Sequence, residues 1–289
     1  MRKVGLSAQD EKEVRYQVAQ ITDLPLLPQS IRRMVEIIYD EIASARELES
    51  LIRYDQSLSG KILRIANSAY YGFRDQVVSI SRAIVTIGYY KARSICVAAL
   101  LMELFSEQRK LDIEYKEAFW KHAFATARIA SEIAKRRPWI RPEDAYILGL
   151  LHDLGHVAMA VHLNDHFVSI QHLAKSRKIP VWCAEFQYGL SHAQVGKWIA
   201  IRWKLPEIFQ RVMEYHHAPE KSPSFEPEVK MIALANILAN SSEFPEYMDD
   251  PFTLSYCGDM FISEEEWEEY QQRLDEIWSE VDQLWSLLG

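Results

Sequence analysis

Apolar side chains recur at steps of three and four residues along most of this chain, which is the spacing of one face of an α-helix. In the N-terminal half, this spacing predicts a helix over 31–38, after the turn Leu24-Pro25-Leu26-Leu27-Pro28. Further helices are predicted over 48–52 and 58–66, over 79–88 with Ser79 as its cap, and over 91–105. The centre of the last helix is apolar on all sides, so we expect it to be largely buried.

The charged residues 106–117 predict a connection to a second helical half. In that half, the same apolar spacing predicts helices over 118–136, 145–163, 166–178, 192–203, 205–216 and 228–240. No segment alternates apolar and polar residues for long enough to predict a β-sheet. We therefore predict an all-α fold with many helices.

The C-terminal residues 263–289 carry an aromatic-rich apolar stripe that predicts an amphipathic helix. The stripe consists of Trp267, Tyr270, Leu274, Ile277, Val281, Leu284 and Leu288, widened by Trp278 and Trp285. Such a stripe either packs on its own domain or forms a seam with a partner helix, in which case the chain forms a homo-oligomer. The acidic outer face of the helix argues against a membrane surface.

The net charge of −8 is unevenly distributed. Residues 242–289 contain 14 acidic side chains and one base, Arg273, so the rest of the chain is basic by +5. The acidic segment and the basic body either attract one another, or the segment keeps polyanions away, or it is simply a solvated helix face. No basic stretch is dense enough to predict nucleic-acid binding.

The cysteine pattern and the apolar runs indicate a cytoplasmic protein. The three cysteines, Cys96, Cys183 and Cys257, lie far apart without a CxxC pair, which suits buried thiols in a reducing compartment. The first 17 residues are too polar for a secretory signal, and no apolar run reaches the roughly 18 to 20 residues that span a bilayer. We expect no association with a membrane.

Histidines provide the strongest chemical signal, because all nine lie between residues 122 and 217. His152 and Asp153 stand side by side in an apolar helical segment, where a buried carboxylate needs a cation, a metal ion or several hydrogen-bond donors. His156 follows one helical turn later on the same face. The further candidates are His122, His192 and the pair His216-His217, which either share one pocket with Asp153 or are ordinary helix residues.

The order of these histidines resembles the HD superfamily of helical metal-dependent phosphohydrolases, and more narrowly the HDOD (HD-related output domain) family. The motifs that carry the resemblance span roughly residues 18–240. They are Leu24-Pro25-Leu26-Leu27-Pro28, the segment 55–72 (DQSLSGKILRIANSAYYG), Gly149-Leu150-Leu151-His152-Asp153-Leu154-Gly155, the segment 191–198 (SHAQVGKW), Trp203-Lys204-Leu205-Pro206-Glu207 and Tyr215-His216-His217.

The resemblance implies a bacterial signalling or regulatory module with a protein partner. It also implies an N-terminal helical lobe over 1–110 and an HD-like helical subdomain over 111–242, followed by an acidic C-terminal extension over 243–289. A working HD hydrolase has the pattern His…His-Asp…Asp, which His122, His152 and Asp153 match. The closing aspartate is replaced by Asn236, whose amide can coordinate a cation but brings no charge.

Two further features bear on catalysis. With Asp153 as the only carboxylate, one divalent ion leaves the site at +1 and two ions leave it at +3, which disfavours a stable two-metal centre. Hydrolases of cyclic dinucleotides in the HD-GYP family carry a lysine where this chain has His156, and a Gly-Tyr-Pro motif that is missing after His217. We therefore do not expect hydrolysis of cyclic dinucleotides.

Two hypotheses follow. The chain is a regulatory protein whose pocket binds a divalent metal ion or a ligand without turnover, or it is a metal-dependent phosphohydrolase acting on a phosphoester or nucleotide. The metal would be Fe, Mn, Ni or Mg, and no residue is assigned a catalytic role. The predicted ligands of the metal are His122, His152, Asp153, His192, His216 and His217, and the predicted ligand-binding residues are His156 and Asn236.

Overall fold

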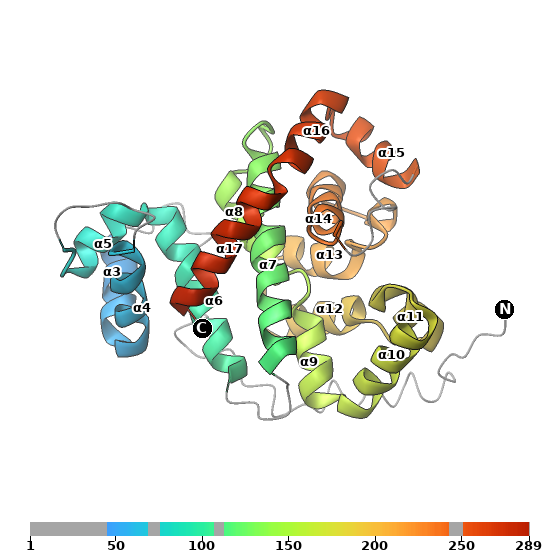
Figure 1. The fold of residues 1–289 in the computed structure, drawn as a ribbon, viewed down its shortest axis with the longest axis horizontal. Coiled ribbons are helices and arrows are strands. Elements are labelled where there is room, and N and C mark those ends of the chain that lie inside the picture. The colour runs from blue at the N-terminus through green and yellow to red at the C-terminus, as the bar shows by residue number, and fades with distance from the viewer. Residues whose placement is uncertain (1–44, 69–75, 107–112, 243–250, 289) are drawn as a thin grey trace. The chain divides into compact units, whose positions relative to one another are not determined.

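The computed structural model describes residues 45–68, 76–106, 113–242 and 251–288, and every regular element in these ranges is a helix (Figure 1). The prediction of an all-α fold is confirmed. The described residues form two compact units, one from the residues between 27 and 107 together with 275–288, the other from those between 108 and 274. The division at 110 and 242 into three parts stays a prediction, and the predicted helix over 31–38 and its preceding turn lie outside the described residues.

The smaller unit contains five helices among its described residues: α3 (Ala45–Tyr54), α4 (Gln56–Ala66), α5 (Ile80–Ile87), α6 (Tyr89–Ser106) and α17 (Leu274–Leu288). Ser79 caps α5 as predicted, since its side chain accepts a hydrogen bond from the amide of Arg82. After α4, the side chain of Asn67 exchanges two hydrogen bonds with the backbone of Val77, at 2.7 and 2.8 Å. Asn67 therefore ties the end of α4 to the start of α5.

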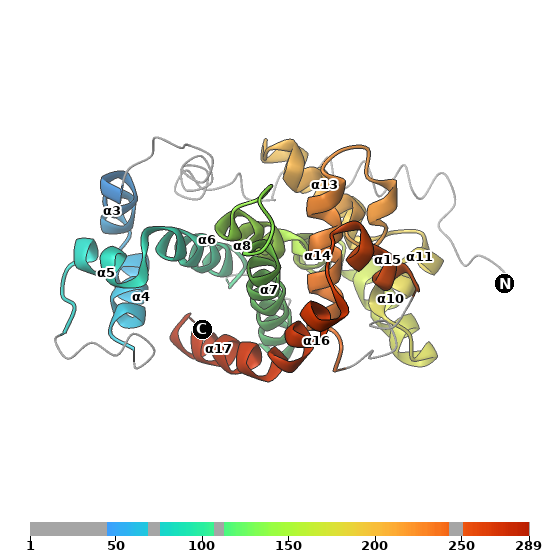
Figure 2. The ribbon, with the colours of Figure 1, turned by 90° about the horizontal axis from the view of Figure 1, so that it is seen from above.

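The larger unit holds the predicted histidines. Its helices are α7 (Ile113–Ala134), α8 (Pro142–Leu151), α9 (Leu154–His162), α10 (Asn164–Arg177), α11 (Val181–Tyr188), α12 (His192–Arg202), α13 (Glu207–Tyr215), the short 3₁₀ helix η1 (Pro219–Lys221), α14 (Glu226–Ala239), α15 (Pro251–Asp259) and α16 (Glu264–Gln272). α7 packs against α8 and α14, and α12 packs against α9 and α13. Figure 2 shows the contact between α7 and α14 from above.

The helix predicted over 145–163 is interrupted at its centre. Asp153 leaves the helical region, with φ −101° and ψ 10°, so that α8 ends and α9 begins around it. The apolar spacing continues through a break in which only one residue leaves the helical conformation, so the spacing does not predict the break. The break places Asp153 at the junction of two helices instead of on the face of one.

Two glycines allow the helices of this unit to approach closely. A Cβ atom on Gly149 would lie 2.7 Å from Cα of Ala127, and one on Gly155 would lie 1.9 Å from the carbonyl oxygen of His192. Both distances are too short for any side chain. Hydrogen atoms at these positions let α8 contact α7, and α9 contact α12, which draws the histidines of α7 and α12 towards Asp153.

The C-terminal stripe forms two helices, α16 and α17, instead of one, because the chain bends at Arg273. α16 is held on the end of α7 by charges: Arg137 contacts Glu266 at 2.9 Å and Arg136 contacts Glu269 at 2.7 Å. Arg273 itself contacts Glu132 at 2.9 Å. This part of the acidic segment is therefore bound to basic side chains of the body, which was one of the alternatives for its charge. An oligomer formed through this segment stays a prediction.

The thiols are free, with Cys96 and Cys257 buried and Cys183 partly exposed. No single helix in the described ranges is both long enough and apolar enough to cross a bilayer. Two pairs of consecutive helices have the required length and apolar character when taken together, but each pair is sharply bent.

Candidate metal centre

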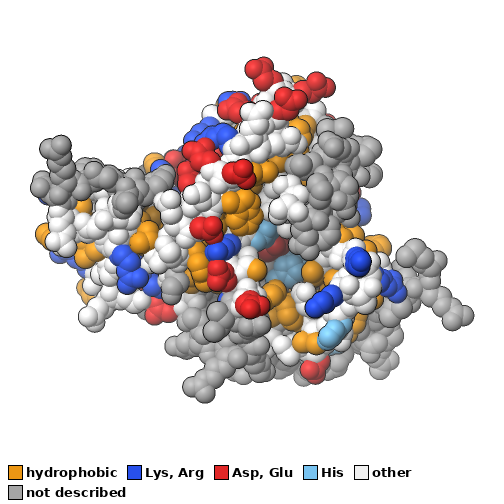
Figure 3. All heavy atoms as spheres, in the orientation of Figure 1, with side chains coloured by type: hydrophobic (Ala, Val, Ile, Leu, Met, Phe, Trp, Pro, Cys, Tyr) orange, Lys and Arg blue, Asp and Glu red, His pale blue; other side chains and the backbone are white. Residues whose placement is uncertain are grey.

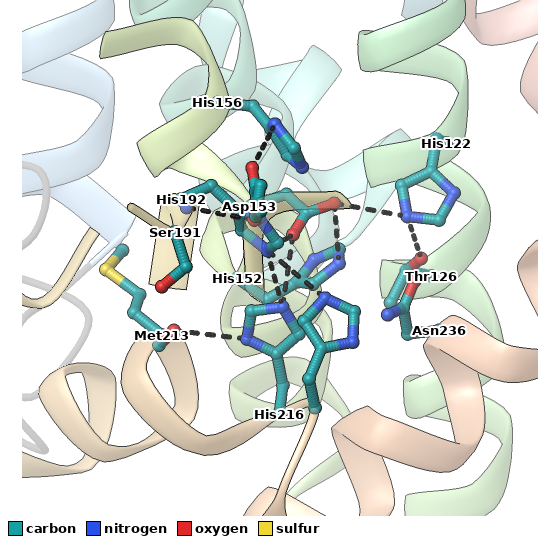
Figure 4. A network of polar contacts seen from close by, with 12 residues as sticks. His122, Thr126, His152, Asp153, His156, Ser191, His192, Met213, His216 and Asn236 are labelled. Carbon is teal, nitrogen blue, oxygen red and sulfur yellow. Dashed lines mark hydrogen bonds and ion pairs between the residues drawn. The ribbon is translucent and has the colours of Figure 1, made fainter. Parts of the chain in front are cut away.

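The six predicted metal ligands gather around the carboxylate of Asp153 (Figure 4). One carboxylate oxygen, Oδ1, lies 3.1 Å from Nε2 of His192 and 3.2 Å from Nε2 of His216. The other, Oδ2, lies 3.2 Å from Nε2 of His152 and 3.4 Å from Nε2 of His122. Residues from α7, the α8–α9 junction, α12 and the end of α13 thus meet at one acidic group.

His217 completes the side of the cluster that faces Oδ1. Its Nε2 atom lies 3.2 Å from Nε2 of His192, and its ring stacks on Trp182 at 5.3 Å with an angle of 18° between the planes. The stacking fixes the direction of the His217 ring.

Hydrogen bonds at the far ring nitrogens orient three histidines. Nδ1 of His152 donates to the carbonyl oxygen of Gly149 at 2.7 Å, and Nδ1 of His216 donates to that of Val212 at 3.0 Å. Nδ1 of His192 donates to the carboxylate of Glu185 at 2.5 Å. When the rings of His152 and His216 are neutral, Nδ1 keeps this proton and Nε2 turns a lone pair towards Asp153, as in histidines that bind metals.

Glu185 on α11 is a functional residue that the sequence analysis missed. It is 1% exposed, and its Oε2 atom also accepts a hydrogen bond from the backbone amide of His192 at 3.1 Å. Its Oε1 atom lies 3.6 Å from Nδ1 of His156, whose ring stacks on that of His192 at 3.8 Å. The available signal was an acid in the largely apolar segment Val181–Tyr188, which the apolar spacing did not identify as a helix.

His156 therefore lies behind His192, in a layer with Glu185, and not against Asp153. It still forms part of a group of three potential ligands, His156, Glu185 and His192, whose donor atoms lie within 4.8 Å of one another. It also contributes to the wall of the cavity described below.

The charges in the cluster separate the pKa values of its members. Burial alone would raise the pKa of Asp153, but the charges of His152 and His192 outweigh burial and hold it well below its usual range. Burial alone would lower the pKa of His192, but Glu185 and Asp153 raise it to about 10. Burial lowers the pKa of His216 to about 4. Burial and the charge of His216 together hold the pKa of His217 well below its usual value. In the absence of a metal ion, protonated His192 thus lies between two carboxylates, beside the neutral rings of His216 and His217.

The donor atoms fit a divalent metal ion. Ligands that neighbour one another around an ion at about 2.1 Å are separated by about 3.0 to 3.4 Å. The distances among Oδ1 of Asp153 and the Nε2 atoms of His192 and His216 are 3.1 to 3.2 Å. His122 and His152 form a second set with Oδ2 of the same carboxylate. Asp153 can therefore serve two neighbouring positions.

Glu185 changes the charge count of the site. With a second carboxylate bonded to a ligating imidazole, one divalent ion leaves the centre neutral and two ions leave it at +2. The electrostatic argument against a two-metal centre is thus weaker than the sequence indicated.

Asn236 on α14 is 4% exposed and lies beside Thr126 and His122 (Figure 4). Its Oδ1 atom accepts a hydrogen bond from the side chain of Asn240 at 2.8 Å. This donor engages one of the two lone pairs of the amide oxygen, which is the atom that coordinates a cation. Asn236 thus faces the cavity without supplying the charge that an aspartate would add there.

The cluster forms the floor of a cavity of about 1250 Å³. Figure 3 shows histidine side chains at the bottom of a hollow, with Lys or Arg side chains on the surface beside it. Its walls include Asn236 from α14, Asn240 directly after that helix, and Thr253 and Tyr256 from α15. A volume of this size accommodates a small organic ligand together with a metal centre.

Solved structures of similar fold come from several bacteria. An HDOD domain protein of unknown function from Geobacter sulfurreducens aligns with a TM-score of 0.77 at 26% identity, covering 94% of this chain and 99% of that one. A phosphohydrolase candidate from Shewanella amazonensis SB2B gives 0.74 at 21% identity (94% and 98%). A signal transduction candidate from Marinobacter aquaeolei VT8 gives 0.77 at 19% identity (98% and 65%).

A curated relative, an uncharacterised protein from Treponema pallidum (strain Nichols), is 25% identical over 242 residues, which are 82% of this chain. The chain spans 46% of that relative's length. The model of the HDOD domain matches residues 24–219, which include Asp153 and the five histidines around it. The chain belongs to the HDOD family.

Proposed function

We propose that this chain is a signalling or regulatory HDOD protein whose histidine–aspartate centre binds a divalent metal ion and, next to it, an anionic ligand, without turning that ligand over. A change in the occupancy of the centre would then be passed to a signalling partner. Similarity to a signal transduction candidate and to an HDOD domain protein supports the regulatory part of the proposal.

One observation carries the metal-binding part. The Nδ1 atoms of His152 and His216 each donate a hydrogen bond to a backbone carbonyl oxygen, so in the neutral rings the Nε2 lone pairs face the oxygens of Asp153 at 3.2 Å. Lone pairs facing carboxylate oxygens repel one another, and burial strengthens the repulsion. A cation at this point converts every one of these contacts into attraction.

The residues that would hold the ion are Asp153, His192, His216 and His217 on one side, and His122 and His152 with the same carboxylate on the other. A bound divalent ion would supply positive charge that polarises a phosphoryl or carboxyl oxygen. Two neighbouring side chains hold these ligands in place: Glu185 aligns His192, and Trp182 aligns His217.

The replacement of the closing aspartate of the HD pattern by Asn236 argues for binding without turnover. Asn236 stands where an HD hydrolase carries an aspartate, and its amide oxygen is engaged by Asn240. The set formed by His122, His152 and Asp153 therefore lacks the carboxylate that would hold a second ion firmly.

Metal-dependent hydrolysis of a phosphoester is the second candidate. It is favoured by the two oxygens of Asp153, each of which faces its own set of imidazoles, because catalytic pairs of ions are commonly joined by such a bridging carboxylate.

Elemental analysis of the protein after stripping and reloading with Mn²⁺, Fe²⁺ or Ni²⁺ tests the proposal. We expect metal in the wild type and its loss in Asp153→Ala and His152→Ala. His172→Ala is the matched control, since this exposed histidine lies on the same cavity but in none of the ligand groups. A wild type that takes up no metal refutes the proposal.

Turnover separates the two candidates. The reloaded protein is assayed with a generic phosphoester such as p-nitrophenyl phosphate. Metal-dependent release of phosphate that disappears in Asp153→Ala would establish the hydrolase and overturn the regulatory reading.

A further inference from the structure

The cavity above the histidine cluster has a basic outer wall that the metal centre does not explain. Lys175 and Lys178, at the end of α10, and Lys221, in η1, line it. On the outer wall the only acid among the described lining residues is Glu220, and its carboxylate accepts a hydrogen bond from the hydroxyl of Tyr256 at 3.0 Å. This wall is therefore positive in a protein whose net charge is −8.

The three lysines differ from most others in the same unit. Lys121, Lys135, Lys197 and Lys230 all form ion pairs with carboxylates at 2.5 to 2.7 Å. Lys116 also has a partner. Within the described part of residues 113–242, the lysines that form no ion pair are Lys175, Lys178, Lys204 and Lys221.

Three of these four unpaired ammonium groups therefore share one cavity. Like charges that gather in a concave wall repel one another and focus a positive potential into the hollow. Such an arrangement is relieved when an anion enters, and a lysine ammonium is a common partner of phosphate. The cavity volume of about 1250 Å³ leaves space for this anion beside the group that would sit at the histidines.

We infer that Lys175, Lys178 and Lys221 form an anion subsite, and that the cavity takes a small organic ligand with two separated phosphate groups. One phosphate would lie at the metal centre and the other at the lysines. The inference rests on the proposed function for the first phosphate and on the lysines alone for the second.

The test compares two probes that differ by one phosphate, fructose 1,6-bisphosphate and fructose 6-phosphate, in titration calorimetry of Mn²⁺-loaded full-length protein. We expect the wild type to bind the bisphosphate about tenfold more tightly. Combined Lys175→Gln, Lys178→Gln and Lys221→Gln changes should remove this advantage and leave the affinity for the monophosphate unchanged. Added salt should reduce the advantage as well, because the lysines are exposed.

Lys204→Gln provides the matched control. Like Lys178, Lys204 is an exposed, unpaired lysine with a left-handed backbone; φ is 53° at Lys178 and 55° at Lys204. Lys204 lies outside the cavity. We expect this variant to keep the full preference for the bisphosphate.

Metal content measured on the same samples separates the two ideas. If the protein takes up no metal, the proposed function fails. If metal is bound but the wild type shows no preference for the bisphosphate, or the preference survives in the triple variant, the lysine subsite is refuted while the metal centre stands.

Discussion

Replacing Glu185 by glutamine tests whether the layer behind the imidazoles matters for the metal centre. The substitution keeps the shape of the side chain and removes one negative charge. Oε2 of Glu185 accepts the Nδ1 proton of His192 at 2.5 Å and the amide proton of the same residue at 3.1 Å. A glutamine can accept one of these hydrogen bonds, but without the charge that makes His192 a stronger ligand.

The expected magnitude follows from the burial of this pair. Removing an outer-layer partner of a metal ligand typically costs about 10- to 100-fold in metal affinity, or about 1.4 to 2.7 kcal/mol. Glu185 and His192 are each 1% exposed, so water cannot screen the lost interaction. We therefore expect a loss in the upper half of that range.

Competition with a chromophoric chelator measures the affinity for Mn²⁺ or Ni²⁺ directly. Glu214→Gln is the matched control: Glu214 is a partly buried acid on neighbouring α13 that pairs with Lys197 at 2.7 Å and belongs to no ligand group. This control should bind metal as the wild type does. Far-UV circular dichroism of the metal-free proteins checks that each variant is folded.

The reasoning is refuted if folded Glu185→Gln protein binds metal with wild-type affinity while His192→Ala does not. In that case, His192 would be held by its place at the start of α12 and not by the carboxylate behind it.

Three other changes have defined outcomes. Gly155→Ala should abolish metal binding and lower the free energy of unfolding by about 3 kcal/mol or more, because its Cβ would lie 1.9 Å from the carbonyl oxygen of His192. In the control Gly60→Ala, the new Cβ meets nothing within 4 Å, so the urea concentration at the midpoint of unfolding should equal or exceed that of the wild type. Burial alone would raise the pKa of Glu132, but hydrogen bonds from Lys135 and Arg128 lower it from 4.5 to about 2. Since the folded-state pKa is the lower one, this stabilisation is present above pH 4.5 and is lost as the pH falls towards 2, so urea unfolding of Glu132→Gln should differ from that of the wild type at neutral pH only. Asn236→Asp should tighten metal binding about tenfold in chelator competition by adding charge beside His122, and an unchanged affinity would contradict the place given to residue 236.

The periodicity of the chain predicts most of the described helices, because one buried face per helix leaves a regular record in the sequence. It misses the interruption at Asp153, whose backbone leaves the helical region, and the one at Arg273, where α16 ends, because the apolar spacing continues through both. It also misses α11 and α15.

The composition of the candidate site was predictable for a different reason. A carboxylate in an apolar helix must find partners, and the histidines available to Asp153 were few enough to name. Glu185 could not be assigned in this way, since its partner His192 follows seven residues later across a turn that the sequence does not orient.

The sequence by itself determined the helical class, the family resemblance and the kinds of side chain that surround Asp153. Only the tertiary structure decided which nitrogen of each histidine faces the carboxylate, that Glu185 stands behind His192, and that Lys175, Lys178 and Lys221 line the same cavity. The physical reason is that apolar burial is repeated along each helix, whereas the direction of a ring nitrogen depends on single hydrogen bonds between atoms that only folding brings together.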